Sequence, residues 1–276
     1  MNSLFSSKRL RWFAALIVIA NGAAPALWIL FTSLKGEAEL TQIPITYLPQ
    51  APTLQNFAAA FADQPLLTFL RNSAIVAVLS TISSLFVSTL AAYAIARLNL
   101  RFRLAILTAI IAVSMFPLVT LMVPLFEIMR GLGLLNTYWA LVLPYTVLNL
   151  PICTLMLVSF FQDIPRDIEN AAMLDGSTRL GALWHIVLPL AAPGVFTAGI
   201  LAFVNAWDEF LLALSMNSAV AYRTLPVGIQ LYQGEFSFPW PIVSAALVVA
   251  LIPVLLLVMI FQEKVVSGLT SGGLKG

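Results

Sequence analysis

Six apolar stretches, each long enough to cross a lipid bilayer, constrain this sequence more than any other feature. A membrane-spanning helix needs about 20 apolar residues, and the chain of 276 residues is 61% hydrophobic and only 9% charged. The stretches are residues 12–34, 69–96, 104–129, 138–161, 186–214 and 241–261. The sequence therefore predicts an all-α integral membrane protein with six transmembrane helices.

The basic residues are unevenly distributed between the segments that connect these stretches. If the N-terminus lies inside, the inner segments hold Lys8, Arg9, Arg11, Arg97, Arg101, Arg103, Arg166, Arg179, Lys264 and Lys275. The outer segments then hold Lys35, Arg71, Arg130 and Arg223. Cytoplasmic segments carry an excess of Lys and Arg, so we expect both termini in the cytoplasm.

The N-terminus also has features of a cleaved signal peptide. A basic cluster is followed by an apolar run and then by the small residues of NGAAPA. The apolar run continues beyond them through residues 28–31 and becomes long enough to span a membrane. We therefore expect the first stretch to be a membrane helix that the protein retains.

Several functional classes are disfavoured by composition. The formal net charge of +2 is too small to indicate a nucleic-acid partner. Cys153 and His185 are the only residues of their types, which leaves no disulfide and no metal site built from Cys or His. The sequence has no G-x-x-x-x-G-K-[ST] loop for binding ATP. Energy from ATP must then come from another chain.

The segment 163–185 is polar although it lies between two apolar stretches. Asp163 is suited to capping a helix, and Gly176 is suited to the left-handed backbone that ends one. Ser177 or Thr178 can cap a second helix. The segment is therefore predicted to form a helix, a glycine turn and a second helix outside the lipid.

The first of these helices has a narrow face of small residues. Ile168, Ala171 and Ala172 follow the i, i+3, i+4 spacing of one helix face. One interpretation is a helix pair that rests on lipid headgroups, but such a face would contain Leu, Phe or Trp. A surface that binds a cytoplasmic protein explains the alanines better.

Two acidic residues interrupt the fifth apolar stretch, within the sequence NAWDE. Asp208 lies about 15 residues after Pro193, or about 22 Å along a helix, and an Asp at a membrane centre costs about 2.5–3.5 kcal/mol. The group therefore either lines a pore or serves helix packing and interfacial capping. The candidate pore residues are Asn205, Trp207, Asp208 and Glu209.

Two outer connections are long. Residues 35–68 contain four prolines, which rule out one continuous helix. Residues 215–240 contain turn signals together with the apolar residues Leu225, Ile229 and Leu231. This second connection is expected either to fold back onto the membrane domain or to contact an outer protein.

The polar segment resembles the cytoplasmic EAA loop of ABC-importer permeases. That pattern is E-A-A, three residues, G, nine residues and I-x-L-P, and the matching positions here are Ala171, Ala172, Gly176, Ile186, Leu188 and Pro189. Stretches similar to the smaller permease of maltose- and trehalose-type importers extend over nearly the whole chain. They include RNSAIVAVLS, LAAYAIARLNL, FFQDIP, NAWDEFLLAL, TLPVGIQ and FQEKVVSGLTSGGLKG.

This resemblance implies a type I ABC-importer permease fold in one domain, residues 1–276, with a coupling-helix loop at 163–185 and a tail at 263–276. It implies a non-enzymatic subunit in the bacterial inner membrane that forms half of the pathway for a di- or oligosaccharide or related glycoside. The implied partners are a homologous second permease, two ATP-hydrolysing subunits that bind ATP and Mg, and an extracytoplasmic sugar-binding protein. The chain itself would hold no cofactor.

The resemblance also assigns residues to contacts with the ATPase. In the loop these are Glu169, Asn170, Ala171, Ala172, Asp175, Gly176 and Arg179, and in the tail they are Gly272, Gly273 and Lys275. The family usually has Glu where this chain has Asn170, and Glu169 lies about 100° around the helix. We therefore expect docking to depend on shape and on Asp175.

Two other functional classes fit the sequence less well. An ion-gradient-driven secondary transporter is the alternative, but such proteins often have inverted repeats and broken helices, which six spans with one acidic pair fit poorly. An intramembrane enzyme would need a metal cluster or catalytic side chains on facing spans, and the sequence indicates neither.

Overall fold

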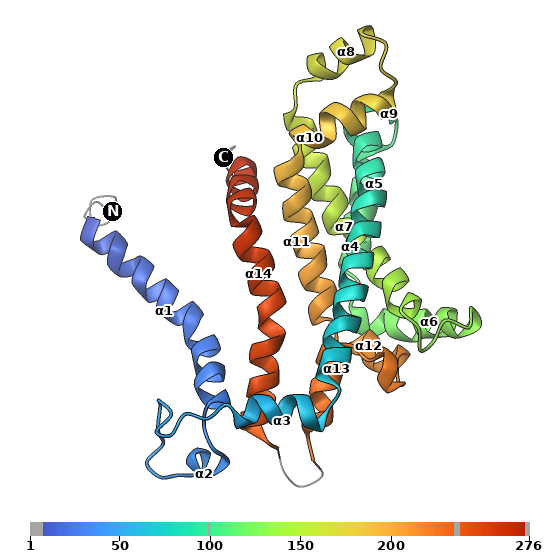
Figure 1. Cartoon of the computed structure of the whole chain (residues 1–276). Coiled ribbons are helices and arrows are strands. Elements are labelled where there is room, and N and C mark those ends of the chain that lie inside the picture. The colour runs from blue at the N-terminus through green and yellow to red at the C-terminus, as the bar shows by residue number, and fades with distance from the viewer. Residues whose placement is uncertain (1–7, 99, 235–237, 274–276) are drawn as a thin grey trace. The chain divides into compact units, whose positions relative to one another are not determined.

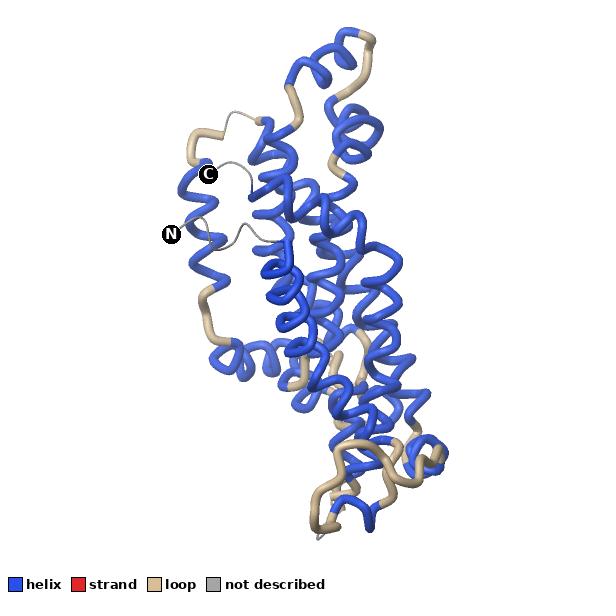
Figure 2. Tube along the Cα trace, turned by 90° about the vertical axis from the view of Figure 1, so that its left-hand side faces the viewer, coloured by secondary structure: helices blue, strands red, loops and turns tan. Residues whose placement is uncertain are grey.

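The described part of the chain consists of helices and loops. The computed structural model describes residues 8–98, 100–234 and 238–273, and side chains from residue 10 to residue 262. Within these ranges there is no strand (Figure 2). The predicted all-α class is therefore confirmed.

The chain divides into two compact units, residues 1–67 with 228–252 and residues 68–227 with 253–276. The first unit contains α1 (Lys8–Ser33), α2 (Glu37–Leu40), α3 (Gln55–Asp63) and η4 (Gln230–Tyr232). The second contains α5 (Arg103–Ser114), α6 (Leu118–Gly131), α7 (Trp139–Asp163), α8 (Arg166–Leu174), α9 (Arg179–Ala182), η2 (Leu183–Val187), α10 (Leu188–Leu190), α11 (Ala192–Asp208), α12 (Leu211–Met216) and η3 (Val220–Tyr222). Three helices cross the boundary: α4 (Leu66–Arg97), α13 (Leu225–Ile229) and α14 (Trp240–Gly273) (Figure 1).

Four helices of the described chain are long and apolar enough to cross a membrane, namely α1, α4, α7 and α14. Two further spans arise only if bent helix pairs are each counted as one. The pair α5 and α6 is bent by 92°, and the helices from Arg179 to Asp208 are bent by 81°. The described residues therefore hold four candidate spans, or six if each bent pair is counted as one span.

Prolines account for both bends. In the predicted span 104–129, Pro117 precedes α6 with extended backbone (ψ 130°), because proline lacks the N–H needed to continue a helix and restricts the residue before it. In the predicted span 186–214, α10 ends at Leu190 and α11 begins at Ala192, with Pro193 in its first turn. That span also ends early, since α11 stops at Asp208 and α12 is a separate helix. Hydropathy alone did not reveal these breaks.

Small polar side chains join α4 to α7 in the second unit. Ser84 Oγ donates to the Thr146 carbonyl at 3.2 Å, and Ser88 Oγ lies 3.4 Å from the Leu150 carbonyl. The Thr154 hydroxyl donates to Ser88 Oγ at 3.2 Å. Lipid gives helices little hydrophobic reason to associate, so small residues that allow close approach and interhelical hydrogen bonds hold such contacts.

Small residues also allow α7 and α11 to approach each other closely. Cys153 of α7 packs against Ala198 and Ala202 of α11, and all three are buried. At Gly194 of α11, an added Cβ would lie 2.3 Å from the ring of Phe160. Since this distance is far below van der Waals contact, the glycine is needed for the two helices to approach.

The outer connections fold back onto their own units. In the second unit, Asn72 Nδ2 donates to the carbonyls of Ala221 and Arg223 at 2.8 and 2.9 Å, and Leu225 is buried. In the first unit, the Tyr232 hydroxyl donates to the Ala60 carbonyl. Burial raises the pKa of Tyr232 to about 12, so this donor keeps its proton. Of the two interpretations of residues 215–240, folding back is therefore favoured.

The predicted tail begins inside a helix. The helix α14 continues from Trp240 through Gly273, so Gly272 and Gly273 belong to its last turn. Lys275 lies outside the described residues.

The close approach at Gly194 gives a first prediction. Gly194→Ala is expected to lower the free energy of unfolding by about 1–3 kcal/mol, because the new methyl group must displace the Phe160 ring. Gly131→Ala is the matched control, since an added Cβ there meets nothing within 4 Å. Thermal unfolding of the purified chain in detergent measures both, and equal midpoints for the two variants would contradict the packing described here.

Candidate functional site

The polar segment 163–185 folds as a helix, a glycine turn and a second helix, as predicted. It forms the tip of the second unit, where α8 and α9 lie beyond the end of α4 (Figure 1). Gly176 has a φ of +94°, which explains why a glycine ends this turn. Thr178 caps α9, with its hydroxyl accepting from the Gly181 N–H at 3.1 Å.

The start of the segment differs from the prediction. Asp163 is the last residue of α7, and the residue that precedes α8 is Pro165. The helix α7 thus continues two residues beyond the predicted end of the span at residue 161, because the apolar pattern fades before the helical hydrogen bonding ends. The first turn of α8 carries Asp167 and Glu169, which suit the positive end of a helix dipole.

The residues assigned to docking divide between two faces of this tip. The exposed members are Asn170, Ala171, Asp175, Gly176 and Arg179. Ala172 and Glu169 are buried in the chain itself, so their side chains face inward and not toward a partner, in contrast to the predicted docking role. Helix periodicity identified the spacing of the faces but not which face the rest of the chain covers.

The exposed face of α8 and α9 is more apolar than the alanine face that was predicted. Ile168 and Leu174 on α8 and Leu180 on α9 are all exposed, with Leu174 at 89%. With Ala171 they form what we call the tip surface (Ile168, Ala171, Leu174 and Leu180). Exposed apolar side chains of this size favour a contact surface. Leu174 and Leu180 are also residues of the kind expected on lipid headgroups, so both interpretations of the segment fit this face.

The second half of the segment is anchored in the core. Leu183 and Val187 of η2 are fully buried and cluster with Tyr93 of α4 and with Leu157 and Phe161 of α7. The segment that follows α9 is therefore packed against α4 and α7.

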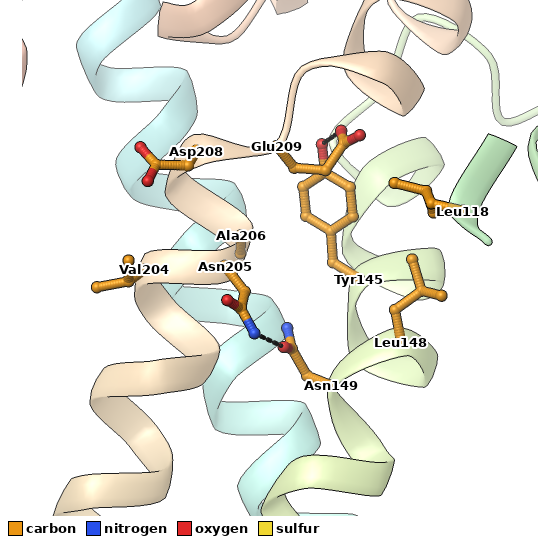
Figure 3. Close-up of a pocket in the computed structure, with 9 residues that line it drawn as sticks. All are labelled: Leu118, Tyr145, Leu148, Asn149, Val204, Asn205, Ala206, Asp208 and Glu209. Carbon is orange, nitrogen blue, oxygen red and sulfur yellow. Dashed lines mark hydrogen bonds between the residues drawn. The ribbon is translucent and has the colours of Figure 1, made fainter. Parts of the chain in front are cut away.

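The candidate pore residues lie at the opposite end of α11, beside a pocket of about 370 Å³ (Figure 3). Of the four predicted residues, Asn205, Asp208 and Glu209 line this pocket. Trp207 does not: it is buried and stacks on Phe203, with ring centroids 5.6 Å apart. Successive residues of one helix point in different directions, which is why the four could not act together.

The two acidic residues have different surroundings. The Tyr145 hydroxyl donates to the Glu209 carboxylate, which also accepts from the N–H groups of Leu212 and Ala213 at 2.9 and 3.1 Å. Glu209 thus serves the otherwise unpaired first turn of α12. The Asp208 carboxylate points away from this network (Figure 3). Glu209 therefore serves as a capping residue for α12. Asp208 has no such role among these contacts, and it is an exposed acidic residue beside the pocket.

Sequence reasoning missed the wall of the pocket that α7 supplies. Tyr145, Leu148 and Asn149 line it together with Leu118, and Asn205 Nδ2 donates to Asn149 Oδ1 at 3.2 Å. Asn149 is a buried amide within an apolar helix, and a polar residue at that position is a signal for a functional site.

The different roles of the two carboxylates give a second prediction. Glu209→Ala is expected to lower the free energy of unfolding by about 1–3 kcal/mol, because it leaves donors on Tyr145 and α12 unpaired. Asp208→Ala is expected to change it by no more than about 0.5 kcal/mol. Thermal unfolding of both purified variants tests this, and a larger loss for Asp208→Ala would reverse the assignment.

Comparison with known proteins agrees with this architecture. The family described as "Binding-protein-dependent transport system inner membrane component" matches residues 84–271. The chain is 70% identical over 276 residues to the sulfoquinovosyl glycerol transport system permease protein SmoH of Agrobacterium fabrum, covering 100% of this chain and 97% of that one. It is 38% identical over 255 residues to the trehalose/maltose transport system permease protein MalG of Thermococcus litoralis, covering 91% of each chain.

A solved structure shares the fold. A chain of a bacterial ABC transporter involved in the import of the acidic polysaccharide alginate superposes with a TM-score of 0.79 at 22% identity, covering 94% of this chain and 98% of that one. The family match spans more than half of the sequence and includes the polar segment and the pocket residues. The chain therefore belongs to the family of inner membrane components of binding-protein-dependent transport systems, and it is a transport permease rather than an enzyme.

Proposed function

We propose that this chain forms half of the translocation pathway of an ATP-driven importer whose substrate is a sugar glycoside. The observation that carries this proposal is the full-length 70% identity to a sulfoquinovosyl glycerol permease. A glycoside that joins a sulfonated sugar to glycerol is therefore the first substrate to test. The trehalose/maltose permease supports the wider class of di- and oligosaccharides and related glycosides.

The pocket beside α11 has the chemistry to contact such a substrate. Asn149 and Asn205 offer amide groups, and Asp208 offers an acceptor for sugar hydroxyls. The negative charge of Asp208 would repel a sulfonate, so the hydroxyl-bearing part of the glycoside is the part that we place against this wall. The sulfonate would then face the second permease.

We propose that the tip surface docks on an ATP-hydrolysing subunit. Two such subunits would be partners of the permease, and they would bind ATP and Mg. A motor that binds the tip and moves would carry the attached helices as a rigid body. This assignment agrees with the exposed Leu174 and Ile168 and with the neighbouring exposed residues Asp175 and Arg179.

The remaining partners and the orientation follow from the same proposal. A homologous second permease would complete the pathway, and an extracytoplasmic protein would deliver the sugar. One structural neighbour is an alginate ABC transporter in complex with a pentasaccharide-bound periplasmic protein, which supports this delivery. With the tip in the cytoplasm, both termini would lie there as well, and the excess of basic residues in the inner segments supports this orientation. The tail with Gly272, Gly273 and Lys275 would then end near the ATPase.

The third prediction tests the energy source. The complete transporter, purified through a tag on this chain and reconstituted in liposomes, is expected to take up sulfoquinovosyl glycerol only with ATP inside and the binding protein outside. The matched control is the chain reconstituted alone under a proton or sodium gradient. Uptake by the lone chain without ATP would refute the proposal in favour of a secondary transporter.

The fourth prediction tests the docking surface. Ala171→Arg is expected to weaken co-purification of the ATPase by about tenfold or more, or about 1.4 kcal/mol, while the chain still inserts and folds. The side chain at 171 is exposed, so the larger residue meets a partner and not the chain itself. Gly176→Pro should have the same effect, because proline cannot adopt a φ of +94°.

The control for this experiment is Ala219→Arg, an exposed alanine in the loop after α12. Ala172→Arg is unsuitable as a test because Ala172 is buried and the substitution would disturb folding. Normal ATPase recovery with both Ala171→Arg and Gly176→Pro would show that the motor binds elsewhere.

A further inference from the structure

A buried network of side chains connects the end of α4 to α8. These two helices are far apart in the sequence, so this network and not the covalent chain holds them together. Tyr93 and Arg97 are four residues apart on α4 and therefore share one face. Arg97 Nε lies 3.1 Å from Glu169 Oε2, and the Tyr93 hydroxyl donates to Glu169 Oε1. A single carboxylate on α8 is thus held by two groups on α4.

Further contacts fix the segments on both sides of α8. Arg97 Nη2 donates to the carbonyl of Ile164, before α8, at 2.9 Å. The Tyr93 hydroxyl lies 3.2 Å from the carbonyl of Arg179, after the glycine turn. In the reverse direction, Arg166 Nη2 donates to the Ala96 carbonyl of α4 at 3.3 Å. The helix α4 therefore holds α8 at its start, at its middle and beyond its end.

Burial makes this network hard to break. The side chains of Arg97 and Glu169 are 4% and 8% exposed, and separating buried charges leaves each of them without water or a counter-ion. In contrast, the side chains of the pair Arg130–Glu127 are 63% and 51% exposed, and a pair of that kind contributes little. These two ion pairs thus provide a test and its control.

Three arginine side chains surround the carboxylate of Glu169, which is the one acidic group among the described residues of this cluster. It lines a pocket of about 200 Å³ together with Arg97, Arg166 and Arg179. Neutralising this one carboxylate would leave three guanidinium groups close together. Loss of Glu169 is therefore expected to loosen the end of α4 from the tip.

We propose that Tyr93, Arg97 and Glu169 form a clamp that makes α4 a third helix moved by the tip, in addition to α7 and α11, to which the segment is covalently joined. This proposal rests on the proposed docking of an ATPase on the tip surface. Within it, Glu169 acts inward as a positioning residue and does not contact the motor. A movement of the tip would shift α4 through the clamp. The contacts of Ser84 and Ser88 with α7 would then move α4 and α7 together.

The first test measures the clamp without depending on transport. Spin labels are attached at Asp167→Cys on α8 and Leu90→Cys on α4, both exposed in the structure, in a Cys153→Ala background that removes the only native cysteine. In the purified transporter the interspin distance is expected to be narrowly distributed and unchanged by ATP. Glu169→Gln and Tyr93→Phe should broaden it. An equally narrow distribution in both variants would overturn the proposal.

The second test asks whether the clamp transmits movement. Glu169→Gln is expected to keep the ATPase bound and hydrolysing ATP, while uptake of sulfoquinovosyl glycerol falls about tenfold or more. Glu127→Gln, in the exposed pair, should leave uptake unchanged. The exchanged pair Arg97→Glu with Glu169→Arg should recover part of the lost uptake if it folds, and Tyr93→Phe provides a milder variant that keeps both charges.

The two proposals fail in different ways. If the unaltered chain binds no ATPase, the docking proposal fails, but the spin-label distances still decide whether the clamp exists. If the ATPase binds and Glu169→Gln transports normally, docking stands and the clamp has no role in transmission.

Discussion

Close approach of helix backbones is the constraint on which the rest of the second unit depends. Apolar side chains gain little by leaving lipid for a helix interface, so α4, α7 and α11 must be held by small residues and interhelical hydrogen bonds. Ser84 and Ser88 supply these on α4, and Gly194 allows α11 to reach Phe160. Larger residues at these positions would separate the helices that carry both functional regions.

Polar chemistry lies at the two ends of this bundle. At one end, Glu169 joins α8 to α4. At the other end, Glu209 joins α11, α12 and Tyr145. In both places the carboxylate was predicted to contact another molecule, but in the structure it binds groups of its own chain. Asn170 and Asp208 are the neighbours that remain exposed for such contacts.

Much of the fold could be predicted because its signals are local. A glycine at the turn and a threonine cap act within a few residues of the chain, and the predictions of turn and cap agree with the structure. Of the six predicted spans, four correspond to single long helices and two to bent helix pairs. The bends at Pro117 and before α11 were missed because apolar content averages over a break. Trp207 stacks on Phe203, four residues earlier on α11, so it fits the packing interpretation of the group and not the pore-lining one.

The sequence by itself determined that the chain is a helical membrane protein with a polar helix pair between two apolar stretches, because composition and helix periodicity are properties of the chain alone. It also carried the spacing by which the permease family is identified. Only the tertiary structure decided that Glu169 and Ala172 face inward while Leu174 faces outward, and that Asn149 of α7 meets Asn205 of α11. Periodicity shows which residues share a face, but the side on which that face is covered depends on helices far away in the sequence.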